Sequence, residues 1–197
     1  MALEFFGPKW FYKGTFSPDD QDEVGDILGD FIEDDGNFTQ PDGWSCDILS
    51  SFNTKQPFMW KKFYPVLDPY LGEFFEQIGT KCPVYPHYQE AWVNKYRKGF
   101  YQEYHTHDDP KMNLSLVYYH RMEEGSHNFK FYSDDHNTYK RSGLDQLINI
   151  PSYQAYTPHL SQGDFILFPS FYPHFVTPIK TDFERVSVAV NINLKRS

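Results

Sequence analysis

Two stretches in the N-terminal part of the chain carry apolar side chains at the spacing of an amphipathic helix. The first runs from about Pro18 to Glu33, and its apolar positions are Val24, Ile27, Leu28, Phe31 and Ile32. Asp68-Pro69 starts a second helix or the last part of one, and Gly79 ends it. Because each helix has one apolar face, both are predicted to pack against the back of a sheet. Residues 37–58 between them are predicted to form a long loop.

From Tyr85 onward the pattern changes to the alternation of β-strands. The predicted strands cover residues 87–96, 101–107, 114–119, 128–132 and 185–194, with a hairpin turn at residues 97–99 and a short apolar strand after Gly163. Residues 133–157 are polar and irregular and are predicted to form a loop or lid. Several short strands with turn signals and no intervening helices favour a mainly β sandwich or jelly roll.

The length and composition agree with this picture. A chain of 197 residues fits one domain, and the aromatic share of 19% suits strands. We therefore expect a single domain over residues 1–197, in which residues 1–80 form helical support and a loop and residues 85–194 form the jelly-roll core.

The charge and the cysteines narrow the classes of partner and the compartment. The chain has 27 acidic and 18 basic residues, a net charge of -9 that repels phosphate backbones, so nucleic acid is not an expected partner. Cys46 and Cys82 are too few for a disulfide framework and are interpreted as reduced thiols. No signal peptide or membrane-spanning run is recognised, so a soluble cytoplasmic protein is expected.

Candidate metal ligands gather in one stretch and recur further downstream. In an extended strand His105, His107 and Asp109 would share one face, and imidazole and carboxylate ligands suit iron, zinc, copper or manganese. His174 follows the Gly163 strand at a distance. Arg185 opens the last strand, so a cation is predicted beside the histidines.

The order and spacing of these motifs resemble the iron(II)- and 2-oxoglutarate-dependent oxygenases. The matching motifs are Trp92-x-Asn94, Gly99-x5-His105-x-His107, Ser115-x-Val117-Tyr118-Tyr119, Gly163-Asp164 with Pro169 and His174, and Arg185-x-Ser187. More narrowly, the chain is similar to a bacterial and phage-encoded branch with His-x-His where better-known members have His-x-Asp. The resemblance covers roughly residues 85–194.

The resemblance implies a double-stranded β-helix, the cupin-like form of the jelly roll, with flanking N-terminal helices and Fe(II) bound by two histidines and usually one acid. His105, His107 and His174 are then the metal-binding and catalytic residues. Counting from the hairpin turn makes His105 the first ligand, and counting back from the following strand makes His107 and Asp109 the pair. We favour His105, because a short hairpin fixes spacing more tightly than a loop. The second ligand is open between His107 and Asp109.

The resemblance also implies 2-oxoglutarate as co-substrate, with ascorbate as an optional cofactor. An arginine on the last strand pairs with the far carboxylate of the keto acid in this family, and here Arg185 can make two charge-assisted bonds to it. Ser187 faces the same way and can add a hydroxyl. Asn94 and Tyr96 lie on the strand before the hairpin, where members often place 2-oxoglutarate contacts. The implied reaction releases succinate and CO2 and most commonly hydroxylates the substrate.

Two other readings are weighed against the oxygenase. The first metal motif of a cupin-type enzyme, which uses no keto acid, also begins with Gly-x5-His-x-His. That motif continues with a glutamate a few residues after the second histidine, whereas this chain has Asp108, Asp109, Pro110 and Lys111 there. The cupin reading also leaves Arg185 unexplained. The second alternative is a non-catalytic jelly-roll binding or structural module. Binding of 2-oxoglutarate separates both from the oxygenase.

The substrate and the assembly are not specified by the sequence. A small molecule or a peptide or protein side chain is expected, with the loops at 37–58 and 133–157 deciding which. The oligomeric state is open, and a phage-encoded protein would work in the cytoplasm of the host cell.

Overall fold

The computed structural model describes residues 9–54, 56–126, 128–133, 135–143, 146–147 and 154–196. These residues form two antiparallel sheets, and their strand orders are β1-β8-β5-β10-β3-β2 and β4-β9-β6-β7. The strands of the larger sheet are β1 (Tyr12–Thr15), β8 (Asp164–Pro169), β5 (Leu114–Arg121), β10 (Arg185–Arg196), β3 (Val84–Tyr96) and β2 (Leu49–Ser50). Those of the smaller sheet are β4 (Gln102–His105), β9 (His174–Val176), β6 (Phe129–Tyr132) and β7 (Ala155–Tyr156). The predicted mainly β, jelly-roll fold is confirmed.

The long strands β3 and β10 form the centre of the larger sheet. In their antiparallel register Arg185 lies opposite Tyr96 and Asn191 opposite Glu90. Side chains of β10 alternate between the two faces of the sheet. Its valines pack against the helices, whereas Arg185, Ser187 and Asn191 line the pocket on the other face. The alternation in the sequence therefore assigned the faces of this strand correctly.

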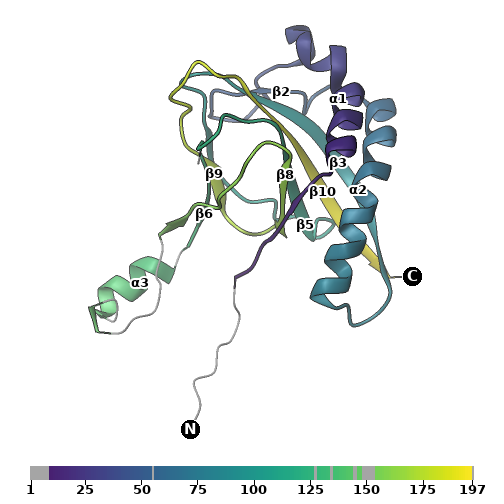
Figure 1. Cartoon of the computed structure of the whole chain (residues 1–197). Helices are drawn as coiled ribbons and strands as arrows, with labels where there is room; N and C mark the ends of the chain where they lie inside the picture. Colours follow the sequence, from purple (N-terminus) through teal and green to yellow (C-terminus); the bar gives the residue numbers. More distant parts are fainter. Residues whose placement is uncertain are drawn as a thin grey trace.

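Two helices cover the outer face of the larger sheet (Figure 1). The first, α1 (Pro18–Glu33), has the predicted bounds, and Val24, Leu28 and Ile32 on its apolar face are buried. It is followed by the short 3-10 helix η1 (Asp35–Asn37). The second, α2 (Pro57–Ile78), begins well before Asp68, so Asp68-Pro69 marks only its last part. Each proline inside a helix costs about 3 kcal/mol, and burial of residues such as Phe63 and Leu67 offsets that cost.

A second core lies between the two sheets and is built mainly from aromatic residues. It contains Tyr96, Tyr119, Phe129 and Phe168, all buried. Tyr118, next to Tyr119 on β5, belongs instead to the core under the helices. Neighbouring residues of β5 thus pack on opposite faces of the sheet. Tyr96, Phe129 and Phe168 of the core between the sheets also line the pocket described below.

The segment predicted as a loop or lid over residues 133–157 is partly helical. Helix α3 (Asp135–Ser142) lies between β6 and β7 and extends away from the two sheets (Figure 1). It carries Asp135 in its first turn and Lys140 and Arg141 in its last, a charge order that complements the helix dipole. It has no apolar stripe, so hydrophobic periodicity could not reveal it. Residues 134, 144–145 and 148–153 of the predicted loop lie outside the described residues.

The predicted loop over residues 37–58 also contains regular structure. Strand β2 pairs with β3, and Pro57 already belongs to α2. No described helix combines the length and apolar character needed to cross a membrane.

Candidate metal centre

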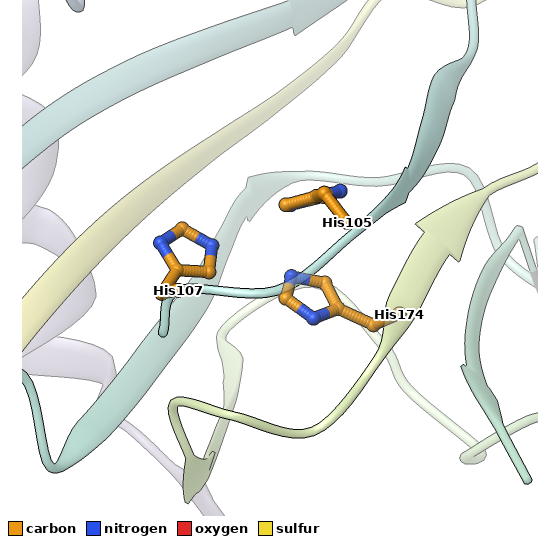
Figure 2. A group of neighbouring side chains, drawn as sticks. All are labelled: His105, His107 and His174. Atoms are coloured by element: carbon orange, nitrogen blue, oxygen red, sulfur yellow. The ribbon is translucent and has the colours of Figure 1, made fainter. Parts of the chain in front are cut away.

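Three histidines from two remote segments meet between the sheets (Figure 2). His105 ends β4 and His174 begins β9, and the antiparallel pairing of these strands sets the two residues opposite each other. His107 follows β4, and its backbone N–H donates to the carbonyl of Ser170 (2.9 Å). One ring nitrogen of each histidine lies within 4.8 Å of the others. Three donors at this separation can converge on one metal ion.

Backbone contacts fix the tautomers of two of the rings. Nδ1 of His105 lies 2.7 Å from the carbonyl oxygen of Glu103, and Nδ1 of His174 lies 2.9 Å from that of Tyr172. A carbonyl oxygen only accepts, so Nδ1 carries the proton in both rings. Nε2 of each ring is then left with a lone pair for a metal.

Burial keeps the three rings neutral. The pKa of His107 is lowered to about 4, mainly by desolvation and secondly by the charge of the neighbouring His105. Desolvation also lowers the pKa of His105, and it lowers the pKa of His174 well below the ordinary value for histidine. Neutral imidazole is the form that binds metal, so no proton has to be displaced at neutral pH.

Asp109 lies outside this group. Its carboxylate accepts the backbone N–H of Lys111 (2.7 Å), and its own N–H donates to the carbonyl of His107 (2.9 Å). These bonds close a tight turn at the surface. Because β4 ends at His105, the strand alternation that would align Asp109 with the histidines does not extend that far. Within the described residues, the structure brings together His105, His107 and His174 without Asp109.

Arg185 is a buried cation in the same pocket as the three histidines, which we call the inner pocket. Its side chain lies over the ring of Tyr96, and it is 3% exposed. Its Nε and Nη1 have no hydrogen-bond partner among the described residues. The neighbouring Glu184 points elsewhere and accepts from Nε of Arg97 (2.7 Å). Unsatisfied buried donors are costly, so this guanidinium fits an anionic ligand.

The other predicted co-substrate contacts also line the inner pocket. Asn94 and Ser187 are buried and directly opposite each other on β3 and β10. Oδ1 of Asn94 has no hydrogen-bond partner within the described chain. The hydroxyl of Tyr96 is turned to Gln102, where it donates to Oε1 (2.7 Å). The structure therefore places all four predicted residues around one pocket, with the Tyr96 ring supporting Arg185.

Gln102 lines the inner pocket and was missed by sequence reasoning, whereas the buried Tyr119 belongs to the core between the sheets. Tyr119 lies opposite Ser187 on the neighbouring strand, and its buried hydroxyl has no partner among the described residues. Desolvation raises its pKa, so the hydroxyl keeps its proton. Gln102 places Nε2 3.3 Å from Nε2 of His105. Strand alternation would put these two on opposite faces, but a register shift between them brings Gln102 to the pocket, and no sequence pattern marks that shift.

The residues present fit a divalent transition metal and a ligand with a carboxylate end. Neutral imidazoles supply the metal donors, and the unpaired donors of Arg185 supply a carboxylate site in the same pocket.

Comparison with known proteins adds a family to this geometry. A family model of 2OG-Fe(II) oxygenases matches residues 90–191, which include His105, His107, His174 and Arg185. No curated protein matches the chain in sequence.

Solved structures with the same fold span almost the whole chain. A Pseudomonas putida prolyl-4-hydroxylase has a TM-score of 0.61 at 14% identity, over 96% of this chain and 94% of that one. The viral collagen prolyl hydroxylase of Paramecium Bursaria Chlorella virus-1, in complex with 2OG, has a TM-score of 0.60 at 16% identity, over 93% and 96%. HygX from Streptomyces hygroscopicus, with nickel and 2-oxoglutarate bound, has a TM-score of 0.62 at 13% identity, over 94% and 83%. These likenesses support the fold, and the family match extends through most of the jelly-roll core. The chain belongs to the 2OG-Fe(II) oxygenase family.

Proposed function

We propose that the inner pocket is the active site of this Fe(II)- and 2-oxoglutarate-dependent dioxygenase. In this proposal His105, His107 and His174 hold the iron, and Arg185 holds the far carboxylate of 2-oxoglutarate. The observation that carries it is the buried guanidinium with unpaired donors in the same pocket as three neutral imidazoles. A dicarboxylate keto acid supplies the anion that the guanidinium lacks and has a second end for the metal.

The chain's own residues orient the co-substrate. Arg185 binds the carboxylate through its planar fork, and Ser187, two positions along β10, adds its hydroxyl. The ring centroid of Tyr96 lies 4.0 Å from the guanidinium carbon, and this cation–π contact holds the guanidinium in place. The ring of Tyr119 lies 5.8 Å from the guanidinium carbon on another side, and its buried hydroxyl has no partner among the described residues. These groups are in place before the ligand arrives, so little ordering is required on binding.

Aromatic packing shields the His174 side of the metal site from water. The ring of His174 lies 5.0 Å from that of Phe168 and 5.4 Å from that of Phe129. When bound, iron supplies the oxidising chemistry, in which R–H, O2 and 2-oxoglutarate give R–OH, succinate and CO2. Exclusion of water strengthens the contact between Arg185 and the carboxylate.

Neither alternative accounts for Arg185. A cupin-type enzyme without a keto acid has no use for a buried cation at this position, and a non-catalytic module has no need of three neutral histidines beside it. The oxygenase uses both features.

The substrate class is proposed at a coarse level. Two of the similar structures are prolyl hydroxylases by name, one of them a collagen prolyl hydroxylase. Their likeness supports a small molecule or a peptide side chain as the group oxidised here. We also propose that residues 1–197 act as one domain in the cytoplasm, of a host cell if the gene is carried by a phage.

The proposal is tested by release of succinate. Purified protein is incubated with Fe(II), ascorbate and 2-oxoglutarate, and succinate is compared with a metal-free control. We expect slow release even without a substrate, its loss in His174→Ala, and its retention in His87→Ala, which removes an exposed histidine of β3. Equal succinate with and without metal would refute the proposal.

A further inference from the structure

A second cavity, which we call the outer cavity, opens beside His105 and His107 and has a volume of about 420 Å³. It shares five lining residues with the inner pocket: Trp92, Gln102, His105, His107 and Asn191. A molecule in the outer cavity therefore lies directly against two of the proposed iron ligands.

The outer cavity is acidic. Its lining includes four carboxylates and no lysine or arginine; the acids are Glu90, Glu103, Asp108 and Asp109. The one arginine of the inner pocket, Arg185, pairs with Tyr96 in the strand register, whereas Glu90 pairs with Asn191 further along β10. At about 3.3 Å per residue, Arg185 and Asn191 are roughly 20 Å apart along the strand. The two cavities therefore adjoin at shared residues, with a buried cation in the inner pocket and the carboxylates along the outer cavity.

Glu90 is oriented by a relay of neutral groups. The hydroxyl of Ser115 donates to Oδ1 of Asn191 (2.9 Å), so the amide nitrogen of Asn191 faces Glu90 and donates to Oε2 (3.1 Å). Within the described residues no lysine or arginine forms a salt bridge with Glu90. Its charge is positioned without being compensated, which is the arrangement expected of a group that receives a cationic ligand.

Aromatic rings form the wall next to these carboxylates. Trp44 and Phe52 have ring centroids 5.7 Å apart, and Phe52 meets Trp92 edge-on at 5.3 Å. Trp92 is 3% exposed, lines both cavities, and its indole N–H has no hydrogen-bond partner among the described residues. Aromatic faces attract ammonium and guanidinium groups, and a buried indole N–H is a donor for a carbonyl oxygen.

We infer that the outer cavity binds the primary substrate as a cation, an aliphatic stem that ends in an ammonium or guanidinium group. The inference rests on the proposed function and narrows its substrate class. Glu90 and the acids of the 103–109 segment receive the charge, and the stem packs along Trp92 with a C–H group toward the histidines. Free basic amino acids and basic side chains of peptides share this chemistry.

The test compares probes in which one side chain is cationic, neutral or anionic. L-Lysine and Gly-Gly-Lys-Gly-Gly are titrated into the protein, alongside the same molecules with norleucine or glutamate in place of lysine. Binding is followed by the fluorescence of the tryptophans that line the cavity. We expect at least tenfold tighter binding of a lysine probe than of its norleucine counterpart, and the weakest binding for glutamate. Whether the free amino acid or the pentapeptide binds identifies the source of the cation.

Two variants locate the effect. Glu90→Gln and, independently, Asp108→Asn should each weaken lysine binding about tenfold without changing norleucine binding, and Glu76→Gln on the exposed face of α2 should change neither. Equal affinities for lysine and norleucine in the wild-type protein, or no binding of any probe, would overturn the inference whether or not a variant folds.

The titrations are run on the protein alone and again with Fe(II) and 2-oxoglutarate under nitrogen. If the proposed function is wrong, 2-oxoglutarate does not bind. If the cationic-substrate inference is wrong, the lysine probes bind no more tightly than the norleucine probes, or no probe binds.

Discussion

The guanidinium carbon of Arg185 lies 4.0 Å from the centroid of the Tyr96 ring, and the two residues face each other across neighbouring strands. The hydroxyl of Tyr96 donates a hydrogen bond to Oε1 of Gln102, and Nε2 of Gln102 lies 3.3 Å from Nε2 of His105. One tyrosine thus connects the arginine proposed to bind the carboxylate with a proposed metal ligand. A change at Tyr96 is expected to disturb both.

Removal of the guanidinium separates co-substrate binding from metal binding. In Arg185→Gln we expect the KM for 2-oxoglutarate to rise between about tenfold and a hundredfold, because a hydrogen bond to a charged group contributes about 1.5–3 kcal/mol. Iron content should be unchanged. The measurement is succinate release against 2-oxoglutarate concentration.

Glu184→Gln is the matched control, since Glu184 adjoins Arg185 but pairs with Arg97 on the outer side. An unchanged KM in Arg185→Gln, or an equal rise in Glu184→Gln, would contradict the assignment of the carboxylate site.

The choice between His107 and Asp109 is tested by metal stoichiometry. Because Asp109 closes a surface turn with Lys111, we expect Asp109→Ala to keep one equivalent of Fe(II). His107→Ala should lose most of it, since it removes one of three neutral donors. Anaerobic titration of both variants with Fe(II) measures how much iron each one binds. If His107→Ala kept its iron and Asp109→Ala lost it, the ligand assignment would be reversed.

Two phenylalanines of α2 test the account of the core. Phe63 is fully buried against the sheet, whereas Phe58 is 72% exposed. We expect Phe63→Ala to lower the free energy of unfolding by about 3–5 kcal/mol. Phe58→Ala should lower it by under about 1 kcal/mol, because the ring is largely exposed and loses mainly its contact with Nζ of Lys62 at 4.8 Å. Urea denaturation measures both, and similar losses would mean that α2 does not pack as described.

The pH dependence of stability should contain a contribution from Asp35. Hydrogen bonds from Arg97 and then Lys95 lower the pKa of this carboxyl to about 2, from 3.8 in the unfolded chain. A depressed folded pKa gives stability that is complete above pH 3.8 and is lost as the pH falls toward 2. Chemical denaturation should therefore show that the difference in free energy of unfolding between wild type and Asp35→Asn shrinks as the pH falls from 3.8 toward 2. A constant difference down to pH 2 would exclude the ion pairs as its origin.

Local patterns were sufficient for the parts of the fold that depend on one element. The apolar spacing of α1 gave its bounds, and the alternation of β10 placed Arg185 and Ser187 on the pocket face. His174 was singled out by its place after an apolar strand. Each of these features is encoded within about a dozen neighbouring residues.

Features that depend on interrupted regularity were not predictable. The strand ends at His105, so Asp109 leaves the face that alternation assigned to it. A register shift moves Gln102 into the pocket. Helix α3 lacks an apolar face, and prolines inside α2 concealed its start. In each case a turn, a shift or tertiary burial overrides the local signal.

We propose above that iron and 2-oxoglutarate share one pocket, in which His105, His107 and His174 hold the iron and Arg185 holds the keto acid. The most direct test of this central claim is an anaerobic titration of the Fe(II)-loaded protein with 2-oxoglutarate, followed in the visible spectrum. We predict a charge-transfer band that saturates at one equivalent, is absent in His105→Ala, and needs a higher concentration in Arg185→Gln. A wild-type protein that binds iron yet shows neither this band nor a change in tryptophan fluorescence would contradict the claim.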